Sequence, residues 1–112
     1  MWGSGMQMYK LRLVMTLWKN ESKSDYVLLQ RNITLPFAPT IGIVIAGDGW
    51  ESGRLRGIRW DTIEQIFVCH TEDDVPGMYG EGCANFPDHL DWRRKQGWEY
   101  APDKMKKNNL VL

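Results

Sequence analysis

The sequence predicts a small, mainly β protein of the α+β class: a strongly bent, five-stranded antiparallel sheet or small barrel with one C-terminal helix. Three observations indicate this fold. Apolar and polar side chains alternate over residues 9–17, three short apolar runs surround a glycine-rich turn between residues 41 and 70, and residues 87–96 carry helix start and stop signals. A chain of 112 residues suffices for one domain with a real core. We expect that domain, with its C-terminal helix and tail, over residues 6–112, and interpret residues 1–5 as a remnant of recombinant expression.

The N-terminal third predicts two paired strands. In the first strand, apolar side chains occupy every second position: Tyr9, Leu11, Leu13, Met15 and Leu17. One face of this strand should therefore be buried and the other largely exposed to solvent. A polar loop over residues 19–25 turns the chain back into a second strand over residues 27–35, whose apolar stripe is interrupted by Arg31. This strand should lie partly at a sheet edge or carry a bulge, and Pro36 and Pro39 should end its pairing.

Three further strands are expected in the middle of the chain. Residues 41–46 are apolar on both faces, which predicts a central strand, and residues 47–53 form a glycine-rich turn. The run 55–60 changes the parity of its apolar positions across Gly57, which predicts a bulge. Residues 63–70 complete the set. Bent strands with a glycine at the corner are typical of short sheets that close on themselves.

A long loop and a helix follow the strands. Residues 71–85 lack regular patterning, and a connection of about fifteen residues is often functional. The helix should span residues 87–96, with Asn85 or Phe86 near its cap, basic residues in its last turn and Gly97 after it.

Charge and cysteine content bear on location and partners. Net charge is zero, but residues 36–91 carry three basic and ten acidic side chains, whereas both flanking segments are basic. A chain with an acidic middle and basic ends can form homo-oligomers, but for the charge pattern itself we favour the interpretation that the opposite patches meet within one monomer. The apolar runs are far shorter than the roughly 20 residues of a membrane span, and the N-terminus lacks a secretory signal. The two cysteines, Cys69 and Cys83, suit a reduced, cytoplasmic chain, while a bridge between them stays open.

Neither a metal nor a cofactor is expected. The zinc-ligand residue types with the closest spacing are Cys69, His70, Cys83 and His89. Neighbours on a strand point to opposite faces, so Cys69 and His70 cannot easily share an ion, and no paired Cys-x-x-Cys motif is present. The glycines of residues 47–53 precede a strand rather than a helix, which excludes the usual phosphate-binding loops.

Four side chains are best suited to binding: Trp50, Trp60, His70 and Tyr79. Trp50 sits at the tip of the glycine-rich turn, where an exposed indole would suit a ligand or a partner; alternatively, it folds back over the barrel mouth or seals a subunit interface. Tyr79 lies in a long, glycine-containing loop and can form the lid of a pocket. We therefore expect a soluble, self-associating binding module for a small ligand or a protein partner, with a pocket or groove near these four residues.

Two other functions stay open. A small enzyme would use His70 with Asp73 or Asp74 for acid–base chemistry at the end of the fifth strand, although acidic loops are usually only solvated. A single-stranded nucleic-acid-binding barrel would use three arginines beside Trp60: Arg54, Arg56 and Arg59. The zero net charge argues against nucleic acid.

A resemblance to other proteins is carried by three short segments: Leu35-Pro-Phe-Ala-Pro-Thr-Ile-Gly42, Gly49-Trp50 and Gly57-Ile-Arg-Trp-Asp61. Over roughly residues 8–70 the chain resembles small hypothetical proteins of bacteria, including some carried on mobile integron gene cassettes. The resemblance implies a bacterial, often accessory and self-associating protein. It includes no motif of known chemistry, and no functional residue is carried over from it.

Overall fold

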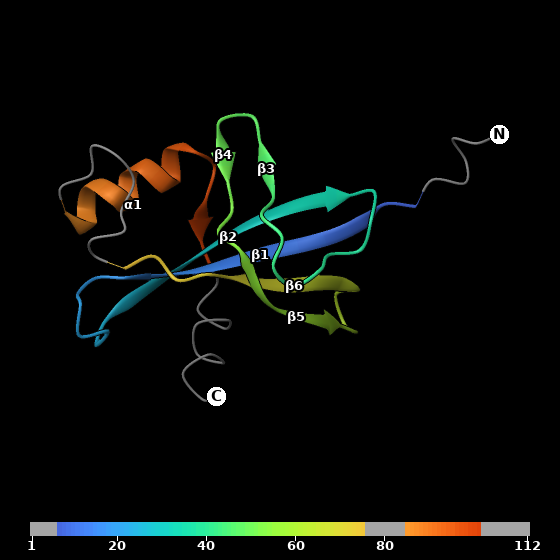
Figure 1. Cartoon of the computed structure of the whole chain (residues 1–112), viewed down its shortest axis with the longest axis horizontal. Coiled ribbons are helices and arrows are strands. Elements are labelled where there is room, and N and C mark those ends of the chain that lie inside the picture. The colour runs from blue at the N-terminus through green and yellow to red at the C-terminus, as the bar shows by residue number, and fades with distance from the viewer. Residues whose placement is uncertain (1–6, 76–84, 102–112) are drawn as a thin grey trace.

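The computed structural model describes residues 7–75 and 85–101, which form a mainly β structure of the α+β class (Figure 1). The described elements follow the chain in this order: β1 (Tyr9–Trp18), β2 (Tyr26–Leu35), β3 (Ala46–Gly47), β4 (Trp50–Glu51), β5 (Leu55–Asp61), β6 (Ile66–Thr71), α1 (Phe86–Lys95) and β7 (Glu99–Tyr100). Five strands form one sheet in the order β5-β6-β1-β2-β7, and β3 and β4 form a separate hairpin. Within the described ranges, no helix is long and apolar enough to cross a bilayer.

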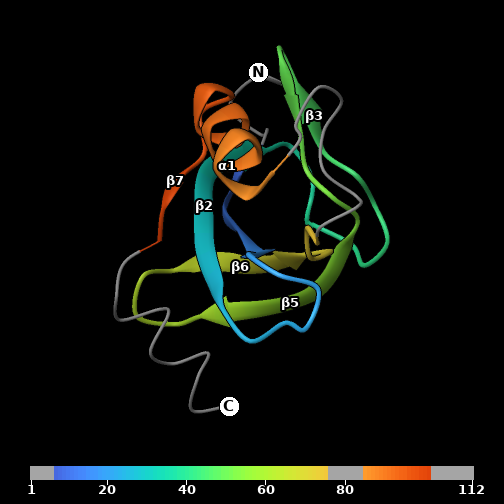
Figure 2. The same cartoon turned by 90° about the vertical axis from the view of Figure 1, so that its left-hand side faces the viewer.

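The sheet is mixed and open, which corrects the predicted antiparallel sheet or barrel. β1 pairs antiparallel with β2 along its whole length, from Tyr9 opposite Leu35 to Trp18 opposite Tyr26, but it pairs parallel with β6. Residues 36–54 carry the chain from β2 to the far side of β1, so the β5–β6 hairpin adds there with β6 parallel to β1 (Figures 1 and 2). Because β5 and β7 remain as separate edges, the sheet does not close or curl strongly.

Residues 41–46 do not form the predicted central strand. Only the last of them belongs to a strand, in the β3–β4 hairpin. The others run beside the start of β5, where the Gly42 N–H donates to the Leu55 carbonyl at 2.8 Å. The apolar residues of this run lie in two different environments, since Ile45 is buried in the core whereas Ile41 is 60% exposed.

The predicted fifth strand begins later than expected. β6 starts at Ile66 because residues 62–65 form the turn of the β5–β6 hairpin, and Ile63 is 90% exposed there. The bulge predicted at Gly57 is confirmed, since the register between β5 and β6 shifts between Leu55 and Gly57. The bulge bends β5 between its contact with the loop and its regular ladder.

The helix prediction is confirmed to within one residue at each end, because α1 spans Phe86–Lys95. Asn85 is the N-cap, and its side chain accepts a hydrogen bond from the Asp88 N–H at 3.0 Å. Basic residues occupy the last turn, where their positive charges interact favourably with the negative end of the helix dipole. Gly97 follows the helix with a φ of +105°.

Arg31 interrupts the apolar stripe of β2 for a structural reason. In the described part of the chain, β7 pairs with β2 only at Leu29 and Gln30, so β2 becomes a sheet edge at Arg31, as predicted. The Arg31 guanidinium lies over the Trp50 ring, with Cζ 4.1 Å from the ring centre, and donates a hydrogen bond to the Gln96 carbonyl. Arg31 thereby links β2 to the β3–β4 hairpin and to the end of α1.

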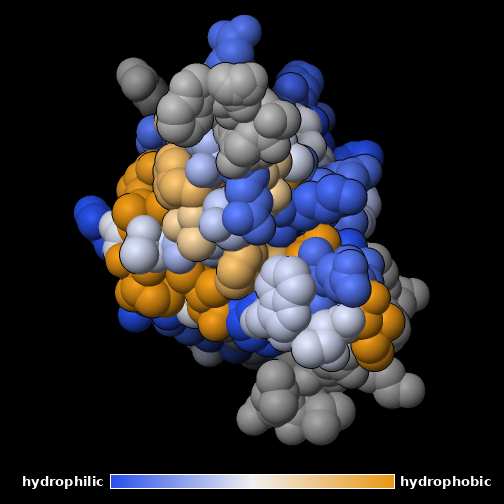
Figure 3. All heavy atoms as spheres, turned by 90° about the vertical axis from the view of Figure 1, so that its right-hand side faces the viewer, coloured by the Kyte–Doolittle hydropathy of each residue, from blue (hydrophilic) through white to orange (hydrophobic). Residues whose placement is uncertain are grey.

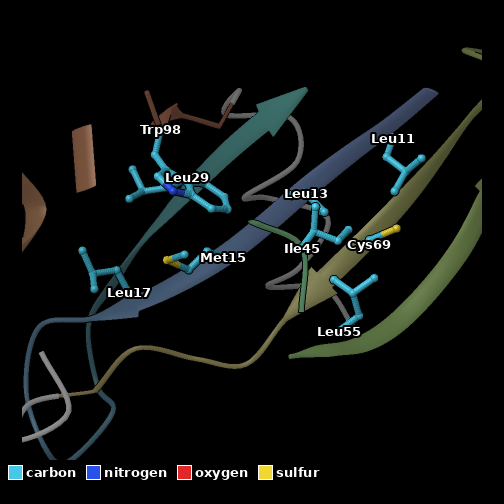
Figure 4. Packing of buried hydrophobic residues seen from close by; sticks show 9 residues of the cluster. All are labelled: Leu11, Leu13, Met15, Leu17, Leu29, Ile45, Leu55, Cys69 and Trp98. Carbon is cyan, nitrogen blue, oxygen red and sulfur yellow. The ribbon is translucent and has the colours of Figure 1, made fainter. Parts of the chain in front are cut away.

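The two faces of the sheet are packed differently. The inner face, against which Trp50 and Leu90 pack, carries the main core (Figure 4): Leu11, Leu13, Met15, Leu17, Leu29, Ile45, Leu55, Cys69 and Trp98. The outer face has a smaller buried cluster: Val14, Leu28 and Val68, with Tyr26, Ile66 and Ala101 packed against it. Because side chains alternate along a strand, each strand residue is assigned to one of these two faces.

Candidate ligand-binding site

An open pocket lies at the end of the sheet where β1 begins and β5 turns into β6. Its volume is about 530 Å³, and its lining includes Met8, Tyr9, Trp60, Glu64, Gln65 and Phe67. We call it the aromatic pocket. Figure 3 views this end of the molecule, where hydrophobic side chains gather beside hydrophilic ones. A pocket of this size with a mixed lining falls within the range of small-molecule sites.

Strand register builds the aromatic wall of this pocket. Trp60 lies directly opposite Phe67 in the β5–β6 ladder, and their ring centres are 5.0 Å apart with the ring planes at 67°. Phe67 in turn meets Tyr9, with 6.2 Å between the ring centres. Aromatic pairs of this kind are favourable by about 0.5–1.5 kcal/mol each beyond the area they bury. They hold Trp60 in place although it is 51% exposed.

The β5–β6 turn holds the polar rim of the aromatic pocket. Asp61 Oδ1 accepts hydrogen bonds from the N–H groups of Ile63 (2.9 Å) and Glu64 (3.0 Å), and the bond from Glu64 is the main cause of the lowered pKa of Asp61. The Glu64 carboxylate accepts two hydrogen bonds from the Arg12 guanidinium, at 2.9 and 3.0 Å, which raise the pKa of Arg12. Gln65 has a φ of +58°, a strained conformation for a non-glycine residue in a pocket wall.

His70 lies on the opposite face of the sheet from the aromatic pocket. It alternates along β6 with Cys69, whose side chain belongs to the inner core. Trp60 lies on the inner-face side of β5, since it pairs with Phe67, which packs against that core. The structure therefore does not bring Trp60 and His70 together.

His70 lines a second open pocket, with a volume of about 540 Å³. We call it the polar pocket, because Lys23, Arg56 and Asp73 also line it. Burial is the main cause of the lowered pKa of His70; the positive charge of Arg59 acts in the same direction, and the negative charge of Asp73 opposes both. A neutral imidazole is therefore the form that the folded protein favours.

We expect an NMR titration to give His70 a pKa below its ordinary value of 6.5. Because the unfolded chain then takes up the proton at a higher pH than the folded protein, stability falls as the pH drops from 6.5 through the folded-state pKa, and His70→Gln should flatten this part of the pH dependence. Arg59→Gln should raise the pKa and Asp73→Asn should lower it, because each removes one of the two nearby charges. A pKa at or above 6.5 would contradict this expectation.

The two acids predicted to serve His70 are held by other groups. Asp73 Oδ2 accepts a hydrogen bond from Trp18 Nε1 at 2.9 Å. The Asp74 carboxylate pairs with two side chains of α1. Within residues 7–75 and 85–101, the structure therefore does not assemble a hydrogen-bonded acid–base pair from His70 and either carboxylate.

A buried charged cluster fastens α1 to the sheet, and the sequence patterns did not predict it. Asp74 Oδ2 lies 2.8 Å from His89 Nε2 and 2.9 Å from Arg93 Nε. Arg93 also reaches the Glu51 carbonyl and the Gln96 side chain, both at 3.4 Å. His89 and Arg93 are four residues apart on one helix face, and this spacing was the available signal. Because His89 is only 1% exposed, it cannot meet a substrate from solution.

Trp50 packs against the core instead of standing out into solvent at the tip of the turn. Its ring meets Trp98 edge to face, with 6.3 Å between the ring centres and 84° between the planes, and Arg31 covers it. Gly47 lies so close to the indole that a β-carbon at this position would collide with it. Trp50 therefore belongs to the packing of the β3–β4 hairpin. Tyr79, the fourth predicted binding residue, lies outside the described residues.

The three arginines predicted to act with Trp60 do not share one surface with it. The Arg54 side chain lies beside Glu72, with 3.9 Å between Nε and the carboxylate. Arg56 lines the polar pocket. Arg59 follows the outer-face parity of β5, whereas Trp60 follows the inner-face parity. This arrangement does not favour a base-stacking groove flanked by all three cations.

Within the described ranges, no three His, Cys, Asp or Glu side chains come together in a way that could hold a metal ion. Cys69 is a free thiol that is completely buried, and burial raises its pKa to about 11. Such a thiol is a poor nucleophile at neutral pH. Cys83 lies outside the described residues.

No protein-family model, curated protein or solved structure matches this chain. The function is therefore inferred from the side chains of the site alone. The aromatic pocket combines an exposed but firmly packed indole with hydrogen-bonding groups on its rim. These properties make the aromatic pocket the candidate site in the described part of the chain.

Proposed function

We propose that this chain is a binding protein that takes a small, planar molecule in the aromatic pocket. The observation that supports this most directly is Trp60, which is 51% exposed and yet held by the rings of Phe67 and Tyr9. An indole half in water has unfavourable hydration that a stacked ligand would relieve. Because the ring is already held in place, little conformational entropy is lost on binding.

The rim of the pocket favours a flat ring that carries hydrogen-bonding groups. Lys10, Glu64 and Gln65 line the same space as the aromatic side chains. The Glu64 carboxylate is paired with Arg12, with 2.9 Å between the charged atoms, so the rim does not demand a cationic ligand. A neutral heteroaromatic molecule, stacked on Trp60 with its polar edge toward the rim, fits these groups best.

The engagement of the acidic groups favours binding over acid–base catalysis. Glu64 is held by two hydrogen bonds from Arg12, and Asp61 is held by two backbone N–H groups of its own turn. A general acid or base has to exchange its proton with the substrate, and a carboxylate fixed in a bidentate ion pair is poorly placed to do so.

Trp60→Ala should weaken the binding of a planar heteroaromatic probe about tenfold or more, because the stacking surface is removed. Binding would be found by ligand-observed NMR with a panel of heteroaromatic fragments and quantified by tryptophan fluorescence. Tyr100→Ala is the matched control, since Tyr100 is 50% exposed at the opposite edge of the sheet. That variant should bind as well as the unchanged chain.

Two results would contradict the proposal. One is that no fragment saturates the protein at millimolar concentration. The other is that both variants bind a fragment equally well, which would place its site away from Trp60.

A further inference from the structure

Among the described residues, β5 is an open edge of the sheet over its second half. It is the first strand in the sheet order, so one of its sides has no strand partner among the described residues. Within residues 7–75 and 85–101, the loop that runs beside β5 forms backbone hydrogen bonds with this strand only at Leu55, at its start. The Asp61 carbonyl accepts the Gln65 N–H across the turn at 2.7 Å and so faces the β6 side. Because backbone groups alternate along a strand, those of Ile58 and Trp60 face outward.

This open edge also presents large apolar side chains. Trp60 is 51% exposed and Ile63, in the adjoining turn, is 90% exposed. Natural edge strands are usually protected by covering loops, prolines, bulges or charges. Here the covering loop and the bulge both lie at the start of β5, so they leave the second half open. An edge of this kind is suited to the addition of another strand.

We infer that a second copy of this chain pairs with β5, antiparallel, about a two-fold axis at Trp60. This register sets Arg59 of each copy opposite Asp61 of the other. Both side chains lie on the outer face, because their partners in β6 belong to the outer-face cluster. Asp61 uses Oδ1 in its own turn, so its Oδ2 can accept the guanidinium of the second copy.

Charge selects this register over its alternatives. A two-fold axis can pass at Ile58 or Trp60, whose backbone groups face outward, or at Arg59 or Asp61, because each of these registers matches outward-facing groups with one another. An axis at Arg59 would set the two guanidinium groups opposite each other, and an axis at Asp61 would do the same with the two carboxylates, so repulsion disfavours both. An axis at Ile58 would set Arg59 opposite Gly57 and would leave Asp61 unpaired across the interface. An axis at Trp60 matches both charges twice and sets the two indoles side by side on the inner face. The two aromatic pockets then adjoin, although the dimer itself does not rest on ligand binding.

Sedimentation velocity of the full chain, without ligand, should show a monomer–dimer equilibrium. Arg59→Asp and Asp61→Arg should each raise the dimer dissociation constant about tenfold or more, because each sets like charges opposite one another twice. An equimolar mixture of the two variants should dimerise like the unchanged chain, since both charge pairs are attractive in the mixed dimer. Arg94→Asp, on α1, changes the net charge like Arg59→Asp and should leave dimerisation as it was.

Asp61→Arg also removes the hydrogen bonds of the turn, so circular dichroism would check its fold. A measurement without any variant supports the test: amide hydrogen exchange at Ile58 and Trp60 should slow as the protein concentration rises. A chain that stays monomeric at millimolar concentration, or folded variants whose mixture stays monomeric, would overturn the proposal. Monomeric Arg59→Asp should still bind the planar probe if the aromatic pocket is the ligand site, so the two proposals can fail separately.

Discussion

Replacing Asp74 with alanine should lower the free energy of unfolding by about 3 kcal/mol, because two side chains of α1 would stay buried without the carboxylate that pairs with them. One oxygen, Asp74 Oδ2, serves both His89 and Arg93. The exposed fractions of the three side chains are small: 14% for Asp74, 1% for His89 and 11% for Arg93. Water cannot replace the lost carboxylate easily at such a site. Urea unfolding followed by tryptophan fluorescence would measure the loss.

The neighbouring Asp73 provides the matched control. Its carboxylate accepts a hydrogen bond from the Trp18 indole at 2.9 Å, and the residue is exposed. Asp73→Ala should therefore cost about 1 kcal/mol or less. Asp74→Asn keeps an acceptor oxygen without the charge and should fall between the two alanine variants. Equal losses in the free energy of unfolding for Asp73→Ala and Asp74→Ala would show that the buried cluster stabilises the fold no more than the exposed hydrogen bond of Asp73 does.

Asp74 has this large expected effect because its backbone and its side chain act on different elements. Its N–H donates to the Thr16 carbonyl at 2.9 Å, and its carbonyl accepts the Trp18 N–H at 2.8 Å, so it extends the parallel pairing beside β1. Its side chain then holds α1 through the charged cluster. One residue thus joins the sheet to the helix, and a loss there should loosen α1 before the strands.

The elements whose formation depends on residues close together in the chain could be predicted from the sequence. The alternation of apolar side chains located β1, and the cap at Asn85 with the basic last turn located α1. Gly57 marked the bulge of β5, because a strand that changes parity has to absorb one extra residue. Each of these signals lies within a few residues of the element that it predicts.

The direction of β6 could not be predicted in the same way. Whether β6 runs parallel or antiparallel to β1 depends on how residues 36–54 cross the sheet, and no local pattern records that path. The apolar run 41–46 was interpreted as a central strand because a core-facing residue such as Ile45 and an exposed one such as Ile41 look alike in a sequence. The barrel prediction was wrong because it was built on that strand.

The same distinction between local signals and contacts of distant residues applies to the candidate site. Trp60 could be named as a stacking residue because it is an aromatic beside arginines on a strand, and the structure places it in the lining of the aromatic pocket. Its separation from His70 depends on the pairing of Trp60 with Phe67, which is a cross-strand property. Asp74 looked like a solvated acid because its partners, His89 and Arg93, lie more than a dozen residues away.

Gly97→Ala should lower the free energy of unfolding by about 2–3 kcal/mol, from two separate causes. Gly97 has a φ of +105°, a backbone conformation that side-chain-bearing residues adopt only with strain. An added β-carbon would also fall on the Arg31 guanidinium, which is held by its hydrogen bond to the Gln96 carbonyl and by the Trp50 ring. Arg31 can give way only by losing one of those contacts.

Two further variants separate these causes. Gly57→Ala is the control, because its β-carbon would meet His70 at an ordinary contact distance of 3.8 Å, and it should be neutral or stabilising by up to about 1 kcal/mol. In an Arg31→Ala background, Gly97→Ala should cost less than in the unchanged chain, since only the backbone strain remains. If Gly97→Ala instead costs the same in both backgrounds, the collision with Arg31 contributes nothing, and the backbone conformation alone requires glycine at the end of α1.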